Sequence, residues 1–209
     1  MRNYIFILFL MIASMGVQAQ ETAMNTSEIT TFKTQIKEVS KSTKTITSDF
    51  VQYKHLDFLT NDIETSGKMA FKAPNWVKWE YTRPYEYSVV FKEDLLLIND
   101  GGTKSNIKMG SSKLFKKLNE LIINSVTGDM FDDDSFEVSY FKTQDFNKVI
   151  FISTDKKMAK MIAVFELHFN KNDGAVLEVK MIEPSQDYTR IVFSNRVVNG
   201  EINDEVFTN

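Results

Sequence analysis

The sequence predicts a mainly β protein with some α-helix: one large, curved antiparallel sheet of about 11 strands, with one helix before it and one within it. Two observations support this fold class. Apolar residues recur at every second position over most of the chain beyond residue 45, and turn-forming sequences separate the alternating segments. The chain also has only three prolines and no repeat or Ser-rich linker, so we expect residues 20–209 to form a single domain.

Residues 1–19 have the features of a signal peptide. Arg2 gives the segment a positive charge, Tyr4 to Ala13 form an apolar stretch, and Val17-Gln18-Ala19 supplies residues that a signal peptidase accepts. The apolar stretch is about half of the roughly 20 residues that a membrane-spanning helix needs. We therefore expect export and cleavage near Ala19, rather than an uncleaved anchor, and a product that is free in the periplasm.

The first element after a short polar tail is predicted to be a helix. Four apolar residues recur at helical spacing: Ile29, Phe32, Ile36 and Val39. Thr26 or Ser27 is suited to cap this helix. The pattern predicts one helix over about 27–41.

Alternating segments follow, and each is predicted to be a strand. They cover 46–51, 63–71, 76–82, 85–92, 95–98 and 104–109, and then 135–143, 147–154, 159–170, 174–183 and 188–198. Asn99-Asp100-Gly101-Gly102 and Lys171-Asn172-Asp173-Gly174 contain residues that tolerate positive φ. These two turns indicate hairpins.

The run of strands is interrupted between about Ser111 and Val126. Apolar residues there follow a spacing of three and four: Leu114, Phe115, Leu118, Leu121, Ile122 and Val126. Charged residues fill the opposite face: Lys113, Lys116, Lys117 and Glu120. This pattern predicts an amphipathic helix.

The composition argues against several functional classes. The chain has no Cys, which excludes disulfides and Cys-ligated zinc, and its two histidines, His55 and His168, are interpreted as strand residues. No HExxH, GxSxG, Walker or dinucleotide-binding pattern occurs, and the acidic loop 129–134 lacks the spacing of a calcium loop. With 25 basic and 28 acidic residues, the chain also lacks the basic excess that nucleic-acid binding needs. We expect no enzymatic activity, metal, cofactor or nucleic-acid partner, although carboxylates from distant segments can still pair in space.

Two parts of the sequence resemble the outer-membrane lipoprotein carrier (LolA) family. The first contains SDFVQ at 48–52, GKMAFKAPNWVKWEY at 67–81 and TRP at 82–84. The second contains DYTRIVF at 187–193 and NGEI at 199–202, with Phe207 after it. The similarity extends over about residues 27–208, in order and with compatible spacing.

The resemblance implies an open, unclosed antiparallel β-barrel in which helices, including a helical lid, cover a hydrophobic cavity. It also implies a periplasmic chaperone, without enzymatic activity, that ferries lipoproteins from the inner to the outer membrane. The implied partners are a lipid-modified protein cargo, an inner-membrane lipoprotein-releasing transporter and an outer-membrane acceptor. We expect the carrier to be a monomer.

A carrier of acyl chains needs a substitute for the membrane interior, because each methylene group moved out of water is worth about 0.8 kcal/mol. The residues expected to line this cavity come from the sheet and the lid: Phe50, Met69, Phe71, Trp79, Tyr81 and Val90, and Leu114, Phe115, Leu118, Leu121 and Ile122. An ordinary packed core would use the same residue types, and the sequence does not separate the two interpretations.

One residue departs from the family pattern. Familiar members have an arginine before the first proline that holds the lid shut, whereas this chain has Ala73. Lys72 is expected to point to the other face of its strand, so the lid-opening mechanism is expected to differ. Two other functions fit the same sequence: a carrier of another amphiphile, such as a glycolipid or a lipid-linked pigment, and a half-barrel sensor module.

Overall fold

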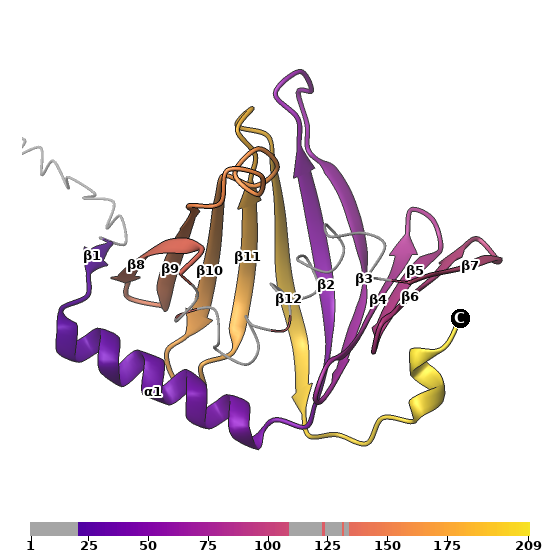
Figure 1. Ribbon diagram of the computed structural model, residues 1–209, viewed down its shortest axis with the longest axis horizontal. Helices are drawn as coiled ribbons and strands as arrows, with labels where there is room; N and C mark the ends of the chain where they lie inside the picture. Colours follow the sequence, from indigo (N-terminus) through magenta and orange to yellow (C-terminus); the bar gives the residue numbers. More distant parts are fainter. Residues whose placement is uncertain (1–20, 109–122, 124–130, 132–133) are drawn as a thin grey trace, which may run out of the picture.

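The computed structural model describes residues 21–108, 123, 131 and 134–209. They form one sheet of 12 antiparallel strands in the order β1-β8-β9-β10-β11-β12-β2-β3-β4-β5-β6-β7 (Figure 1). β1 (Thr22–Ala23) and β7 (Thr103–Lys108) lie at the two ends of this order and do not pair with each other, so the sheet of described residues does not close. The predicted open, unclosed barrel is therefore confirmed. The predicted signal peptide lies outside the described residues.

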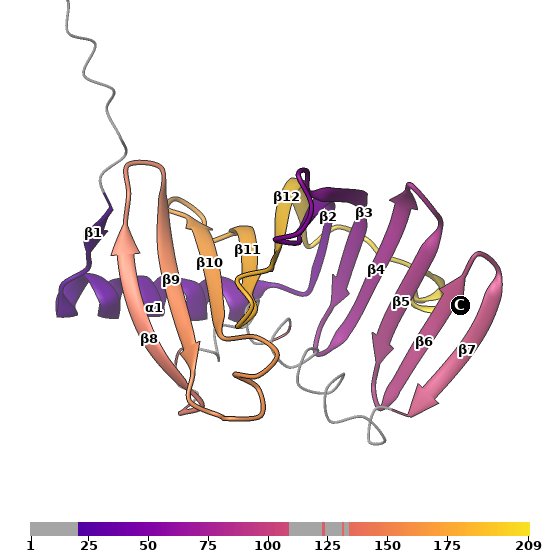
Figure 2. The same cartoon turned by 90° about the horizontal axis from the view of Figure 1, so that it is seen from above.

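The strands of the first half follow helix α1 (Thr26–Ser42) directly. They are β2 (Thr45–His55), β3 (Ile63–Lys72), β4 (Trp76–Arg83), β5 (Tyr87–Lys92), β6 (Leu95–Asp100) and β7 (Thr103–Lys108). The second half contains β8 (Phe136–Lys142), β9 (Phe146–Ser153), β10 (Val164–Asn170), β11 (Val176–Ile182) and β12 (Tyr188–Val198). β12 pairs with β2 and joins the two halves, which Figure 2 shows as two curved walls.

The predicted helix is confirmed as α1 (Thr26–Ser42). The predicted cap was wrong by one residue, because Asn25 is the cap: its side chain accepts a hydrogen bond from the Glu28 backbone N–H, and the Glu28 side chain accepts one from the Asn25 N–H. The buried residues of α1 are Phe32 and Ile36. Phe32 packs edge-on against Phe169 of β10, with ring centroids 5.2 Å apart, so α1 is fixed on the concave side of the second half.

Two strands differ from the predicted pattern. The polar tail contains a short strand, β1 (Thr22–Ala23), which pairs with β8. β10 begins at Val164 rather than near 159, because the Asp155 side chain accepts hydrogen bonds from the Lys157 and Met158 N–H groups and holds the preceding segment in a turn. The helix predicted over 111–126 lies outside the described residues, except for Ile123, which is helical.

The glycines of the first predicted hairpin have the conformation that its sequence requires. Gly101 and Gly102, between β6 and β7, both have positive φ, at 54° and 97°. Two consecutive residues with positive φ match the turn that fits the right-handed twist of two-residue hairpins.

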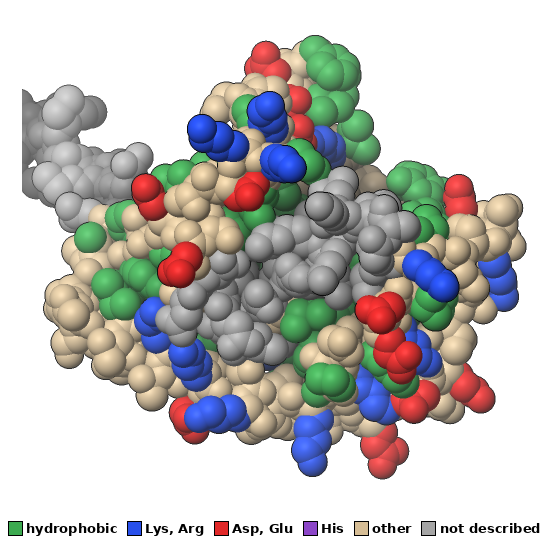
Figure 3. Space-filling view, viewed as in Figure 1, with side chains coloured by type: hydrophobic (Ala, Val, Ile, Leu, Met, Phe, Trp, Pro, Cys, Tyr) green, Lys and Arg blue, Asp and Glu red, His purple; other side chains and the backbone are tan. Residues whose placement is uncertain are grey.

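The surface is mixed in charge. Basic and acidic side chains alternate over the described part of the face in Figure 3. Apolar side chains gather at the tip of the β2–β3 hairpin, where Phe58 is 81% exposed. Within the described ranges, no helix combines the length and apolar character needed to cross a membrane.

Candidate functional site: an apolar cavity

A cavity of about 290 Å³ lies on the concave face of the sheet, between its two halves and α1. Its wall from the first half of the sheet consists of Ile46, Ser48, Gln52, Met69, Phe71, Val77, Trp79, Tyr81, Tyr87, Val89 and Phe91. Its other wall consists of Ile36, Val39, Thr43, Phe165, Gly174, Val176, Val179, Met181, Ile191, Phe193 and Arg196. The lining is therefore mostly aromatic and aliphatic, as expected of a site that binds hydrocarbon.

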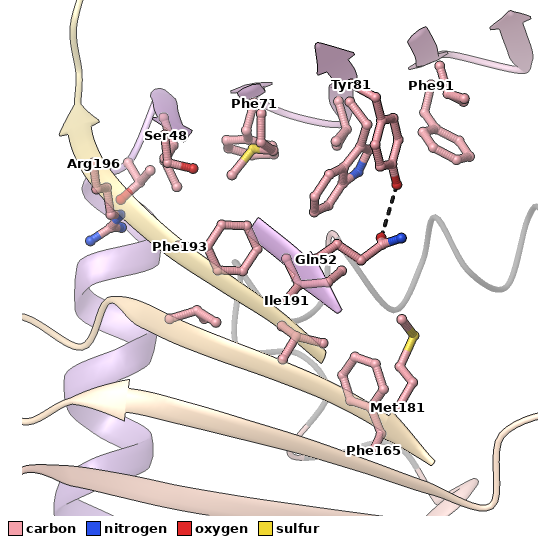
Figure 4. Close-up of a pocket in the computed structure, with 18 of the residues that line it drawn as sticks. Ser48, Gln52, Phe71, Tyr81, Phe91, Phe165, Met181, Ile191, Phe193 and Arg196 are labelled. Carbon is pink, nitrogen blue, oxygen red and sulfur yellow. Dashed lines mark hydrogen bonds between the residues drawn. The ribbon is translucent and has the colours of Figure 1, made fainter. Parts of the chain in front are cut away.

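Alternation along the strands produces this lining. Val77, Trp79 and Tyr81 occupy every second position of β4, so all three point to the same face of the sheet. Ile191 and Phe193 of β12 follow the same rule. Figure 4 shows Tyr81, Ile191 and Phe193 facing the same space from strands that are far apart in the sequence.

Four of the six cavity residues predicted from the sheet line the cavity: Met69, Phe71, Trp79 and Tyr81. Phe50 lies on the same face but does not line the cavity. Its side chain is 1% exposed, and its ring packs edge-on against Trp79 and Tyr81 at centroid distances of 5.0 and 5.1 Å. Phe50 therefore supports the wall from within the core.

Val90 is a correction to the prediction. It lies on the opposite, convex face, where it forms a small buried cluster with Ala70 and Phe207. Phe207 belongs to the 3-10 helix η3 (Asp204–Phe207), which covers this face of β4 and β5. The β5 residues that line the cavity are Tyr87, Val89 and Phe91, which alternate with Val90 along the strand.

The five predicted lid residues, Leu114, Phe115, Leu118, Leu121 and Ile122, lie outside the described residues. The prediction for Lys72 agrees with the structure, because Lys72 forms an ion pair with Asp204 of η3 on the convex side. Lys72 therefore does not replace the arginine that is missing at Ala73.

The prediction missed the whole second wall. Phe165, Val179 and Met181 line the cavity from β10 and β11, and Ile36 and Val39 line it from α1. The alternation of these strands and the helical spacing of α1 indicate that each has an apolar face. The sequence does not show that these faces meet the first wall, because the pairing of β12 with β2 brings the two walls together.

Polar groups in the cavity are few. The Tyr81 hydroxyl donates a hydrogen bond to Gln52 Oε1 at 3.1 Å, and burial, with smaller contributions from Tyr85 and Tyr87, raises the pKa of Tyr81 to about 12. Tyr81 is thus a neutral donor at physiological pH. Ser48 Oγ and Trp79 Nε1 are buried, and neither has a hydrogen-bond partner in the part of the chain that the structure describes.

The remaining candidate residues do not gather into a catalytic arrangement in the described residues. His55 and His168 occupy β2 and β10, as interpreted from the sequence. His55 Nδ1 lies 2.8 Å from Asp62 Oδ1, and the ring of His168 stacks on Phe146. No group of three or more His, Asp or Glu side chains suited to a metal ion occurs among the residues described.

Solved structures share this fold at low sequence identity. A protein of the DUF1329 family from Desulfovibrio piger is 14% identical, with a TM-score of 0.50, and the match covers 87% of this chain and 97% of that one. An uncharacterized conserved protein from Thermus thermophilus is 6% identical, with a TM-score of 0.52, over 86% and 91% of the two chains. The lipoprotein LppX from Mycobacterium tuberculosis is 10% identical, with a TM-score of 0.50, over 86% and 99%. At these identities the likeness concerns the fold alone.

The sequence itself identifies the family. No curated protein matches the chain. Residues 41–209, however, match the family described as outer membrane lipoprotein carrier protein LolA. This range includes all 11 strands from β2 to β12 and nearly the whole cavity lining. The resemblance noted at 48–84 and 187–207 is therefore confirmed, and the chain belongs to the LolA family of outer membrane lipoprotein carrier proteins.

Proposed function

We propose that this protein carries lipid-modified proteins through the periplasm, from the inner to the outer membrane, and shields their acyl chains in the apolar cavity. The observation that carries this proposal is the combination of a LolA-family sequence with a cavity lined mostly by apolar side chains. Acyl chains cannot cross water unshielded, and a cavity wall of this kind offers them an equivalent environment. In this proposal the protein has no enzymatic activity and works as a monomer.

The residue types of the lining suit a cargo with variable chains. Aromatic side chains such as Phe165 and Phe193 provide large apolar areas, while Met69 and Met181 adapt to different shapes because their side chains are unbranched. A wall of this kind favours broad affinity over selectivity for one chain length.

The proposal extends to the predicted lid. We expect Leu114, Phe115, Leu118, Leu121 and Ile122 to cover the bound chains. A Leu118→Asp substitution should then weaken cargo binding more than it lowers the free energy of unfolding. An equal loss of both would indicate that Leu118 is an ordinary core residue.

The cargo can be identified directly. The protein is purified from periplasm under mild conditions, and the bound molecules are extracted and analysed by mass spectrometry. Acylated protein supports the proposal. Free glycolipid, phospholipid or pigment without acylated protein would contradict the proposal and favour a carrier of another amphiphile. Such a carrier would not require an inner-membrane lipoprotein-releasing transporter or an outer-membrane lipoprotein acceptor.

A further inference from the structure

One end of the cavity contains a positive charge. Arg196 of β12 lines the cavity, and its side chain is only 21% exposed. Most other residues of the lining, such as Ile46 and Phe193, are apolar. Figure 4 shows Arg196 and Ser48 at one end of the cavity, with Phe165 and Met181 toward the other.

A break in the strand turns Arg196 inward. Ile191 and Phe193 point into the cavity, so regular alternation would direct residue 196 to the outer face. The pairing of β12 with β2 shifts, however, because Ser194 opposes Asp49 and Val197 opposes Thr47. Two residues of β12 therefore face the single residue Ser48, which is the definition of a β-bulge.

The bulge is formed by Asn195, and its conformation fits this role. Its φ is 52°, a value that asparagine tolerates better than most residues. Its side chain points outward and donates a hydrogen bond to Asp49 Oδ2 at 2.7 Å. A bulge of this kind changes the face of the sheet to which the next side chain points. Here it directs the Arg196 side chain into the cavity.

The Arg196 guanidinium is weakly paired. Its one acidic partner among the described residues is Asp173, at an Nη1–Oδ2 distance of 4.0 Å, and the Asp173 side chain is 62% exposed. Burial lowers the pKa of Arg196, while Asp173 acts in the opposite direction. The side chain remains a cation, and it lies mostly buried at the end of a largely apolar cavity, which is unfavourable unless an anion or strong acceptor lies nearby.

The residue opposite the bulge, Ser48, adds a second polar group. The hydroxyl of Ser48 is buried, and in the described part of the chain it has no hydrogen-bond partner. A hydroxyl that can donate and a guanidinium with five N–H donors therefore share the same end of an apolar cavity.

We propose that Arg196 and Ser48 form a head-group site for a negatively charged amphiphile, whose carboxylate or phosphate binds here while its chain extends along the cavity toward Phe165 and Met181. This inference rests on the proposed function only in requiring that the cavity accept acyl chains. It adds that an anionic head group is favoured over a neutral one.

The test compares ligands that differ only in the head group. Dodecanol, laurate and dodecyl phosphate have the same chain length, and each is titrated at neutral pH against the full protein loaded with the uncharged fluorophore N-phenyl-1-naphthylamine. We expect laurate or dodecyl phosphate to displace the fluorophore about tenfold more effectively than dodecanol, because a charge-assisted hydrogen bond is lost with the alcohol. The tighter of the two anions identifies the head group as carboxylate or phosphate.

Three variants locate the effect. Arg196→Gln should remove the preference for the anions over dodecanol, and Arg196→Lys should keep part of that preference. Arg190→Gln is the matched control, because Arg190 lies on the same strand but on the outer face, where its guanidinium contacts Glu178 at 2.9 Å. It should keep the full preference. Thermal unfolding followed by circular dichroism verifies that each variant is folded.

The outcomes separate the two proposals. If dodecanol and the anions bind equally and Arg196→Gln changes nothing except the unfolding temperature, Arg196 is a structural residue and this inference is wrong, while acyl-chain binding stands. If no ligand displaces the fluorophore from any folded variant, both proposals fail.

Discussion

Two neighbouring valines of β5 allow a direct comparison of cavity and core. Val89 lines the cavity, whereas Val90 is 0% exposed and packs under Phe207 on the convex face. The same substitution, Val→Asp, can be made at both positions. The expected results differ because the two side chains have different surroundings.

At Val90, the substitution removes about 1.5 kcal/mol of apolar burial and places a carboxylate in a site without a partner, which costs several kcal/mol more. The total, on the order of 4 kcal/mol, is a large part of the roughly 5–15 kcal/mol that stabilises a typical domain. At Val89, the new carboxylate faces the cavity and can be hydrated there, so we expect a loss of about 1 kcal/mol. A bound acyl chain would have to displace that water, which should weaken binding by about 100-fold or more.

Urea denaturation gives the free energy of unfolding, and displacement of N-phenyl-1-naphthylamine by a triacylated lipopeptide gives the affinity. Val89→Asp should keep most of its stability and lose binding. Val90→Asp should have a much lower free energy of unfolding, and the fraction that remains folded should bind the lipopeptide with normal affinity. If the two variants were equally unstable, the concave face would be an ordinary core and the reasoning would be refuted.

Four further outcomes follow from local contacts. Gly67→Ala should lower the free energy of unfolding by about 3 kcal/mol, because the added Cβ would lie 1.9 Å from the carbonyl oxygen of Glu80; an unchanged urea midpoint would contradict this. Asn25→Ala should cost roughly 1 kcal/mol by removing the cap of α1, measured by thermal unfolding, and no change would show that the capping box is dispensable. Burial lowers the pKa of His168, although Glu178 acts in the opposite direction, so the folded protein binds a proton at this imidazole more weakly than the unfolded chain does. The free energy of unfolding should therefore fall as the pH drops below about 6.5. His168→Gln should reduce this dependence of stability on pH. The pKa of Tyr81 is raised to about 12, so its contribution to stability should be lost as the pH rises from 10 toward 12, and ultraviolet titration of Tyr81→Phe should lack the last-ionising tyrosine.

Much of the fold could be predicted from periodicity. The helical spacing of Phe32 and Ile36 predicted α1, and alternation predicted 11 of the 12 strands, because each pattern reflects one buried face. β1 could not be predicted in this way. It has two exposed residues, and only its pairing with β8 makes it a strand.

The candidate site was harder to predict, for two physical reasons. The run Val89-Val90-Phe91 is apolar on both faces of β5, so alternation does not indicate which face meets the cavity. The convex face, where Val90 lies, is buried by Phe207 from the far end of the chain. Arg196 was missed because a bulge at Asn195 reverses the alternation, and a bulge depends on the pairing of two strands rather than on local sequence.

The central claim is that acyl chains occupy the concave cavity, and the two tryptophans of the chain can test it directly. Trp79 lines the cavity, whereas Trp76 lies on the convex face, with its ring 5.6 Å from that of Phe207. A triacylated lipopeptide with brominated acyl chains quenches a tryptophan that it contacts. Quenching should persist in Trp76→Phe, which retains only Trp79, and disappear in Trp79→Phe. Equal quenching of both tryptophans, or quenching of Trp76 alone, would contradict the account.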